Sequence, residues 1–547
     1  MKYRFRIAVV VLLVATLAGS PTVRCQTLAE TGGTLFSPQT SPTGRELLWE
    51  CLDRNGSIWI TDRSGAAPTF LTQGHSPSWV DGESFKFVRS VDDGHQVLAE
   101  SLYLYELPSG RVTLLAAGTG NADYVAVATP ATTVSFPERG LAGTVVCLDP
   151  GHGMNTGAYC DFSKKIEDVY ALQSAYMVKN YLERSGATVE MTRYTHGQNP
   201  ALTARVNFSN SVGAKVFHSI HYNSATNATA RGSETWYRSG DTTSRAQARK
   251  VQGRMIEAAG LPDRGARADK ENLGYYLGVL SANHATRRKS LSEGGFLSNA
   301  DDAAAVDDPE VNDRLSWGVY AGLCDTLNVT PVAPWTPVAE PLVEKFAGPL
   351  SDRWVGAPVE TSQTPTPGGD DAAAVISSAP GRPACLRTGG FCWRDYTVAA
   401  TVRLDGEEIA PYGLLARCSA QDGEKWVGYV LSVDERQKEA TLLASMDSSG
   451  TAIVVGRLPL GDTPAKQRWR SLTVECAADQ VKASVDGVPL APVEVSSSAQ
   501  QAINDVIRRG QVGVLLSASS SKARLAIDEL SMTVPSPGRS VQRAPVR

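Results

Sequence analysis

The sequence has 547 residues, of which 42% are hydrophobic and 20% are charged, and its formal net charge at pH 7 is −4. At roughly 150 residues per domain, this length predicts three or four domains, and the composition excludes a chain that is disordered throughout. Because the charge is near neutral and no long run of Lys or Arg occurs, nothing in the electrostatics points to nucleic acid as a partner.

The first 20 residues, MKYRFRIAVVVLLVATLAGS, have the pattern of a secretory signal peptide. Cationic residues come first, an apolar run follows from Ile7 to Leu17, and small residues come after it. The apolar run is shorter than the roughly 20 residues that a membrane-spanning helix needs. We assign residues 1–25 to this signal and expect an exported protein of the periplasm, cell envelope or extracellular space, without a membrane span after signal cleavage.

Residues 30–136 contain an internal repeat that indicates a small all-β domain. A first copy, SPTGRELLWECLDRNGSIWITD, is followed by a second, SPSWVDGESFKFVRSVDDG, and each combines a Ser-Pro entry, a turn glycine and alternating apolar residues. This pattern resembles the blades of TolB-type β-propellers, whose period is about 40 residues. Two blades cannot close a ring, so we expect a small β domain, with a third partial blade in NADYVAVATPATTVSF.

Residues 141–330 alternate between strand and helix signals, which predicts an α/β domain with a largely parallel sheet. The first strand, VVCLD, is a continuous apolar run, as in a strand that is covered on both faces. We expect strands at 145–149, 188–193, 215–223, 234–237 and 290–293, and helices at 166–185, 200–214, 243–259 and 309–327.

The remainder of the chain is expected to contain one further domain. A Pro-rich linker occupies residues 331–341, short alternating strands fill residues 342–534, and residues 535–547 form a loose tail. The strand QVGVLLS followed by IDELSMTV resembles laminin G and concanavalin-type jelly rolls. We therefore expect a central α/β domain flanked by a small N-terminal all-β domain and a C-terminal β-sandwich of the jelly-roll type.

The sequence has only seven histidines, and two of them follow predicted strands of the α/β domain. His152 lies between two glycines in LDPGHG, a turn that by itself would equally suit a plain loop or a phosphate cradle. His221 ends FHSIH, and the carboxyl ends of parallel strands meet at one sheet edge, so the two imidazoles can converge. His218 faces the other side of its strand and is expected in the core. We assign no role to His75, His95, His196 and His284.

Two glutamates are candidates to complete the site. A catalytic metal site commonly has three protein ligands, and two His with one carboxylate is a frequent zinc set. Glu167 opens the helix after the His152 loop, although a first-turn acid also stabilises a helix dipole without any ligand role. Glu293 ends a strand in SLSEGGFLSN, where an exposed polar strand end is the alternative.

Together these motifs resemble a known family. LDPGHG, NTGA, IED, MTR, LTARVNFSN, FHSIHYN and EGGFLSN occur in the order and spacing of zinc-dependent N-acetylmuramoyl-L-alanine amidases of the type 3 family. The resemblance covers about a third of the chain. It implies that Zn²⁺ is bound by His152, Glu167 and His221, that Glu293 is the catalytic acid/base, and that the substrate is the amide joining N-acetylmuramic acid to L-alanine in peptidoglycan.

Two positions depart from the family pattern. Met154 stands where a third glycine is usual, and Tyr170 stands where an asparagine is common. Neither departure removes a ligand. The segment between His221 and Glu293 looks too short for the long inserted helix that blocks the site in some regulated members, so we expect an open active site.

Two alternatives remain at this stage. In the first, the chain is a non-catalytic adaptor whose flanking β domains bind wall glycan or an envelope protein. In the second, the C-terminal domain is a glycan hydrolase that uses Glu407 and Glu408, although adjacent strand residues point to opposite faces. Trp393, Trp426 and Trp469 could line a sugar platform there, but core packing is the more usual role of such residues.

Overall fold

The computed structural model shows two compact units, Met1–Ala333 and Pro334–Arg547, which are described separately below. The boundary falls in the segment predicted as a linker. The signal-peptide segment and the predicted third partial blade lie outside the described residues. The structure describes residues 26–27, 34–52, 56–63, 68–117, 140–336 and 338–346, and residues 351–535 with gaps at 352, 357–358, 364–366, 368–371, 378–383, 406–407, 420–426, 446–451, 462–467, 508 and 518–522.

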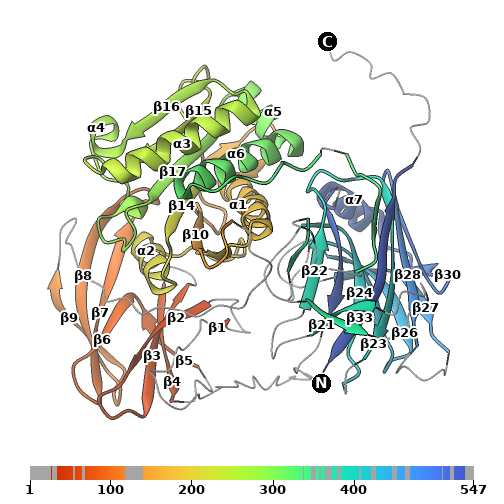
Figure 1. Ribbon diagram of the computed structural model, residues 1–547. Helices are drawn as coiled ribbons and strands as arrows, with labels where there is room; N and C mark the ends of the chain where they lie inside the picture. The colour runs from red at the N-terminus through yellow and green to blue at the C-terminus, as the bar shows by residue number, and fades with distance from the viewer. Residues whose placement is uncertain are drawn as a thin grey trace. The chain divides into compact units, whose positions relative to one another are not determined.

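The two copies of the N-terminal repeat form two separate antiparallel sheets (Figure 1). Their hydrophobic core includes Leu48 and Ile58 from one sheet and Phe85, Phe87 and Tyr105 from the other, so the sheets pack together. The first sheet contains β1 (Gln26–Thr27), β2 (Thr34–Thr40), β3 (Glu46–Leu52), β4 (Ser57–Asp62) and β5 (Thr69–Gln73), and the second contains β6 (His75–Trp79), β7 (Ser84–Asp92), β8 (Val97–Glu106) and β9 (Arg111–Ala117).

The central sheet has the strand order β13-β10-β14-β17-β15-β16. All neighbouring pairs in it are parallel except β15 with β17. The prediction of a largely parallel sheet in an α/β domain is therefore confirmed. The strands are β10 (Val145–Pro150), β13 (Thr188–Met191), β14 (Val216–Asn223), β15 (Ser233–Tyr237), β16 (Asp263–Ala268) and β17 (Lys289–Phe296), and a small hairpin of β11 (Tyr159–Cys160) and β12 (Lys165–Ile166) follows β10.

The predicted helices cover the two faces of this sheet. On one face lie α1 (Glu167–Arg184), α3 (Thr242–Ala259) and α6 (Pro309–Leu327), and on the other lies α2 (Leu202–Ser211) (Figure 1). Helix α6 begins where predicted because Asp308 caps it by accepting a hydrogen bond from the amide of Glu310, and Pro309 suits the first helical position. The shorter helices are η1 (Gly278–Leu280), α4 (Asp269–Leu273) and α5 (Ala300–Asp307).

The N-terminal sheets pack against the same face of the central sheet as α2. Phe36 of β2 meets Phe208 of α2 edge to face, with ring centroids 5.2 Å apart. These two rings share one hydrophobic core with Leu52 of β3 and Phe217 of β14. The all-β domain and the α/β domain are therefore parts of one unit with a continuous core, and this packing brings the N-terminal loops near the edge of the central sheet.

The C-terminal unit contains two antiparallel sheets in its described part, each of eight strands. Buried and half-buried residues alternate along Tyr396–Leu404, as the alternating sequence predicts for a strand with one covered face. One sheet contains β18 (Leu342–Glu344), β20 (Val359–Gln363), β21 (Ala372–Ser377), β23 (Tyr396–Leu404), β28 (Arg470–Ala477), β29 (Gln480–Val485), β30 (Val488–Pro489) and β33 (Arg524–Thr533). The other contains β19 (Val355–Gly356), β22 (Ala384–Thr388), β24 (Tyr412–Ser419), β25 (Val427–Asp434), β26 (Glu439–Ser445), β27 (Ala452–Pro459), β31 (Ala491–Pro492) and β32 (Gln511–Leu516), and α7 spans Ser497–Val506.

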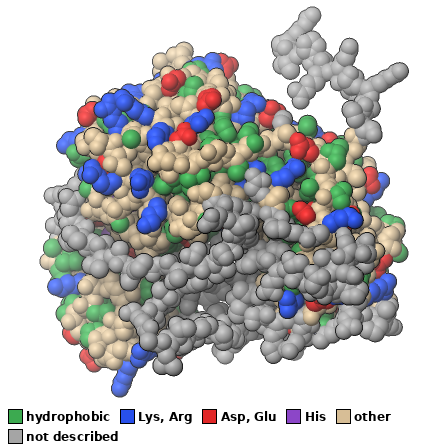
Figure 2. Space-filling view, viewed as in Figure 1, with side chains coloured by type: hydrophobic (Ala, Val, Ile, Leu, Met, Phe, Trp, Pro, Cys, Tyr) green, Lys and Arg blue, Asp and Glu red, His purple; other side chains and the backbone are tan. Residues whose placement is uncertain are grey.

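The surface of the α/β domain has no single-sign charge patch on the face that Figure 2 shows, where Lys and Arg side chains are interspersed with Asp and Glu. Among the helices of the described residues, none combines the length and the apolar character that crossing a membrane requires.

Candidate active site

The loop after β10 places His152 at the edge of the central sheet, and its glycines are required by close packing. A Cβ added to Gly151 would lie 2.4 Å from the ring of His221, and one added to Gly157 would lie 2.8 Å from Glu167 and 2.9 Å from the His152 ring. Any larger residue at these positions would collide with the side chains of the site. This explains why His152, itself at φ 58°, is surrounded by glycines.

Two buried arginines hold this loop through its backbone. Arg205 of α2 donates to the carbonyl oxygens of His152 at 2.8 Å and Pro150 at 2.9 Å, and it pairs with Asp149 at 2.8 Å. Arg193 donates to the same Pro150 oxygen at 2.9 Å. Burial acts to raise the pKa of Asp149, but Arg205 and neighbouring hydroxyls outweigh it and lower this pKa to about 2. The motifs MTR and LTAR thus position the His152 loop.

His152, Glu167 and His221 converge into a group that could hold a metal ion, with one ligand atom from each lying within 4.8 Å of the others. Glu167 Oε2 lies 3.2 Å from Nε2 of His152, and Oε1 lies 2.9 Å from Nδ1 of His221. All three side chains are buried, and Nε2 of His152 has no hydrogen-bond partner among the described residues. A buried nitrogen without a partner beside a carboxylate suits coordination of a cation.

The protonation of this group also suits a metal. Burial acts to raise the pKa of Glu167, but His152 and His221 outweigh it and hold this pKa well below its usual value. Burial lowers the pKa of His221 to about 4, so its ring is neutral at neutral pH, which is the form that binds metals.

Glu293 lies beside this group on β17. In the register of the sheet it is opposite His221 of β14 and Glu234 of β15. Burial, together with the charges of Glu167 and Glu234, raises the pKa of Glu293 well above its usual value. Its Oε2 atom is buried and has no hydrogen-bond partner within the described residues. A raised pKa makes the carboxylate form of Glu293 a stronger proton acceptor, as a general base requires.

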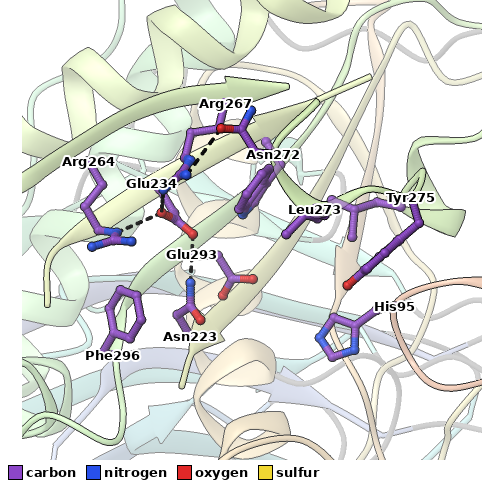
Figure 3. Close-up of a pocket in the computed structure, with 12 residues that line it drawn as sticks. His95, Asn223, Glu234, Arg264, Arg267, Asn272, Leu273, Tyr275, Glu293 and Phe296 are labelled. Atoms are coloured by element: carbon purple, nitrogen blue, oxygen red, sulfur yellow. Dashed lines mark hydrogen bonds and ion pairs between the residues drawn. The ribbon is translucent and has the colours of Figure 1, made fainter. Parts of the chain in front are cut away.

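Glu293 faces a cavity of about 320 Å³ (Figure 3). One wall of this cavity holds Glu234, which accepts ion-pair hydrogen bonds from Arg264 at 2.8 Å and Arg267 at 3.1 Å. His95, from the loop between β7 and β8, lies on the other side of the cavity from these arginines (Figure 3). The described residues thus leave space for a substrate beside Glu293.

The structure brings together all four residues singled out in the sequence, namely His152, Glu167, His221 and Glu293. His218 is fully buried and hydrogen-bonds Ser290 and Ser292, as expected for a core residue. Sequence reasoning missed His95, because nothing in its loop marks a functional residue and its nearness to the site comes from the packing of two domains.

The two departures from the family pattern lie beside the site without disturbing its side chains. Met154 has a φ of 54°, and its amide donates to the carbonyl oxygen of His196 at 2.6 Å. The hydroxyl of Tyr170 donates to Asp307 at 3.0 Å and also contacts Ser163.

The structure of the C-terminal unit gives little support to the alternative that this unit is a glycan hydrolase. Trp393 is fully buried, which makes it a core residue rather than part of a sugar platform. Glu408 lies 3.8 Å from Arg436, and Glu407 and Trp426 lie outside the described residues.

Comparison with known proteins identifies the α/β domain. Residues 146–325 match the family model described as N-acetylmuramoyl-L-alanine amidase. The chain is 28% identical over 196 residues to the germination-specific N-acetylmuramoyl-L-alanine amidase of Bacillus subtilis, covering 34% of this chain and 79% of that protein. It is 31% identical over 198 residues to an uncharacterized cell wall amidase of Bacillus anthracis, covering 34% of this chain and 36% of that protein.

Among solved structures, the catalytic domain of CwlV, an N-acetylmuramoyl-L-alanine amidase from Bacillus (Paenibacillus) polymyxa var. colistinus, is 29% identical. That likeness covers 34% of this chain and 99% of the CwlV domain, with a TM-score of 0.31. The family match and the two sequence relatives agree with each other. Residues 146–325 therefore form an N-acetylmuramoyl-L-alanine amidase domain.

Proposed function

We propose that this chain uses zinc to hydrolyse the amide between N-acetylmuramic acid and L-alanine in peptidoglycan. The observation that carries the proposal is the convergence of His152, Glu167 and His221, with the buried carboxyl of Glu293 beside them and a cavity in front. The amidase class follows from the family match. The identity of the metal and the roles of the four residues are the new part of the proposal.

The donor set fits zinc. Two imidazole nitrogens and one carboxylate oxygen form a frequent set in catalytic zinc sites, which keep a further position open for water or substrate. The His152 nitrogen without a hydrogen-bond partner is the ligand atom that such an ion would satisfy. A zinc ion held there would lower the pKa of a water molecule and polarise the scissile carbonyl.

The residues of the chain then supply the proton transfers. As the water oxygen bonds to the carbonyl carbon, the carboxylate of Glu293 accepts the water's proton. Glu293 then gives this proton to the amide nitrogen, the C–N bond breaks, and L-alanine leaves with a free amino group while the lactyl group becomes a carboxylic acid. Transfer of this kind typically accelerates a reaction by ~10²- to 10⁴-fold.

The flanking parts of the chain are given supporting roles. We assign the two N-terminal sheets to propeller-type blades and the C-terminal sheets to a jelly-roll sandwich. Wall glycan or an envelope protein is the kind of partner that these β domains would bind. A peptidoglycan substrate requires a location outside the cytoplasm, in agreement with the predicted signal peptide, and the periplasm or cell envelope is the proposed place.

Two substitutions test the assigned roles. Glu293→Gln removes the proton acceptor but leaves the three ligands, so we expect about one zinc per chain and a loss of turnover of at least about 10²-fold. His221→Ala removes a ligand, so we expect the loss of both zinc and turnover. Zinc is measured by elemental analysis, and turnover is measured as new L-alanine amino termini released from peptidoglycan.

A matched control is Glu310→Gln on α6. Glu310 is a partly exposed carboxylate of the same domain that pairs with Arg314, and it is not among the residues that line the cavity beside Glu293. We expect this variant to keep the zinc content and turnover of the unsubstituted protein. Full turnover by Glu293→Gln would contradict the acid/base assignment.

A further inference from the structure

The loop between β7 and β8 brings a third imidazole to the amidase site. The ring centroid of His95 lies 5.5 Å from that of His152 and 6.3 Å from that of His221. Its ring lines the same cavity as Glu293, opposite the wall that carries Arg264 (Figure 3). The N-terminal all-β domain therefore contributes a side chain to the cavity in which the proposed reaction takes place.

The backbone of this loop is fixed both within the loop and to the amidase domain. Oδ1 of Asp93 accepts hydrogen bonds from the amides of His95 at 2.9 Å and Gln96 at 2.8 Å. From the amidase domain, the amide of Gly278 donates to the carbonyl oxygen of His95 at 2.8 Å. The main chain of His95 is thus held by a side chain of its own loop and by a main-chain amide of the amidase domain.

Packing against the amidase domain holds the loop further. A Cβ on Gly94, whose φ is 87°, would lie 3.4 Å from the ring of His152, so the loop backbone lies against this ring. Val97 packs into the hydrophobic core shared with α2, and Glu100 of β8 accepts a hydrogen bond from Thr203 of α2 at 2.8 Å. These contacts make the loop a fixed wall of the site.

Both nitrogens of the His95 ring are available to a ligand. Among the described residues, no hydrogen bond reaches either of its ring nitrogens. The rings of His152 and His221 contact Glu167. The remaining four rings form hydrogen bonds or an ion pair with neighbouring groups: His75 with Ser76 and Ser90, His196 with Asp168, His218 with Ser290 and Ser292, and His284 with the Val279 carbonyl oxygen.

The geometry separates His95 from the metal-binding group. The cluster with ligand atoms within 4.8 Å of one another contains His152, Glu167 and His221, and His95 is not a member of it. His95 instead lines the cavity beside this group together with Glu293, the space through which a substrate carbonyl would approach the three ligands. A fixed N–H donor in this place can stabilise negative charge that develops on a carbonyl oxygen.

We propose, on the basis of the proposed function, that His95 is a further catalytic residue, whose ring N–H donates a hydrogen bond to the scissile carbonyl oxygen during hydrolysis. When the water oxygen bonds to the carbonyl carbon, the C=O electron pair moves onto this oxygen, and the bond to His95 strengthens as the charge grows. This electron pair forms the C=O bond again when the C–N bond breaks. The active site is thus assembled from two domains.

The test uses the full chain with the variants His95→Ala and His95→Gln. Removing one donor to a developing oxyanion typically costs 10²- to 10³-fold in kcat, so we expect His95→Ala to lose about 10²-fold in kcat with unchanged zinc content and little change in KM. His95→Gln keeps an N–H donor and is expected to lose less. Gln96→Ala, in the same loop but away from the cavity lining, is the matched control with unchanged kinetics.

Several results would overturn the inference. One is an unchanged kcat in His95→Ala, and another is a rise in KM alone. A third is faster turnover of His95→Ala combined with weaker zinc binding, because that result would show that His95 is a zinc ligand that blocks the open position of the metal. If Glu293→Gln is inactive while His95→Ala is unaffected, only this inference fails. If the unsubstituted protein releases no L-alanine amino termini from peptidoglycan, the proposed function fails together with it.

Discussion

At the scale of single residues, the candidate site depends on glycines that leave room for its side chains. The His221 ring occupies the space beside Gly151, and Glu167 and His152 occupy the space beside Gly157. Sequence motifs could single out the four candidate residues, which the structure brings together, because each lies at a strand end or helix start. His95 has no such local signal, since its contact with His152 joins two domains.

Met154 leads to a prediction of stability at this scale. Its φ of 54° lies in the left-handed region, which costs a non-glycine residue about 1–2 kcal/mol. Glycine avoids this cost but loses about 0.5–1 kcal/mol through its larger unfolded-state entropy. We therefore expect Met154→Gly to raise the free energy of unfolding by about 0.5–1 kcal/mol, measured by denaturant titration.

The matched control for this prediction is Ala158→Gly in the same loop. Ala158 is not among the residues with positive φ, and its amide bond to Glu167 Oε2 at 2.9 Å does not depend on its side chain. Glycine there brings only the entropic cost, so a fall in stability is expected. If both variants are destabilised equally, backbone strain at Met154 does not lower the free energy of unfolding of this protein.

At the scale of elements, the well-patterned helices and buried strands could be predicted and the edge elements could not. Helix α6 was predicted as 309–327 because its start carries a cap and a proline. Strand β16 was missed because it lies at the sheet edge and reads DRGARA, without an apolar run. Helix α5, ADDAAAVD, is short and alanine-rich, and the capping side chain of Asn299 was its only strong signal.

The packing of α6 against α1 leads to a prediction of pH dependence. Burial raises the pKa of Asp313 to about 7, although the Tyr181 hydroxyl, which donates to it at 2.8 Å, and Arg184 and Arg314 act to lower it. The folded state therefore binds this proton more tightly than the unfolded state does. The resulting stability is complete below about pH 4 and is lost as the pH rises through 7, by about 1.4 kcal/mol per unit at most.

Asp313→Asn tests this sign. Asparagine can still accept the Tyr181 hydrogen bond but does not titrate, so the variant should lose this contribution to the pH slope and be the more stable protein at pH 8. The measurement is the difference in unfolding free energy between the two proteins at pH 5 to 8, in which groups common to both cancel. A difference that does not change with pH would refute the assignment.

At the scale of the whole molecule, the N-terminal sheets and the amidase domain form one unit with a shared core. The repeat pattern could predict that the N-terminal segment folds into antiparallel strands. It could not predict where these strands dock, because the docking contacts, such as Phe36 with Phe208, join residues far apart in the sequence. The active site is therefore a property of two domains, while the family resemblance covers only one.

The central claim is that this chain is a metal-dependent amidase of peptidoglycan, and product analysis with and without a chelator tests it most directly. The full chain is incubated with peptidoglycan, and the new chain ends are identified by mass. We expect glycan strands with free lactyl carboxyl groups and peptides with free L-alanine amino termini, both lost with the chelator and restored by zinc. Products with new reducing sugar ends, or cleavage that the chelator leaves unchanged, would contradict the claim.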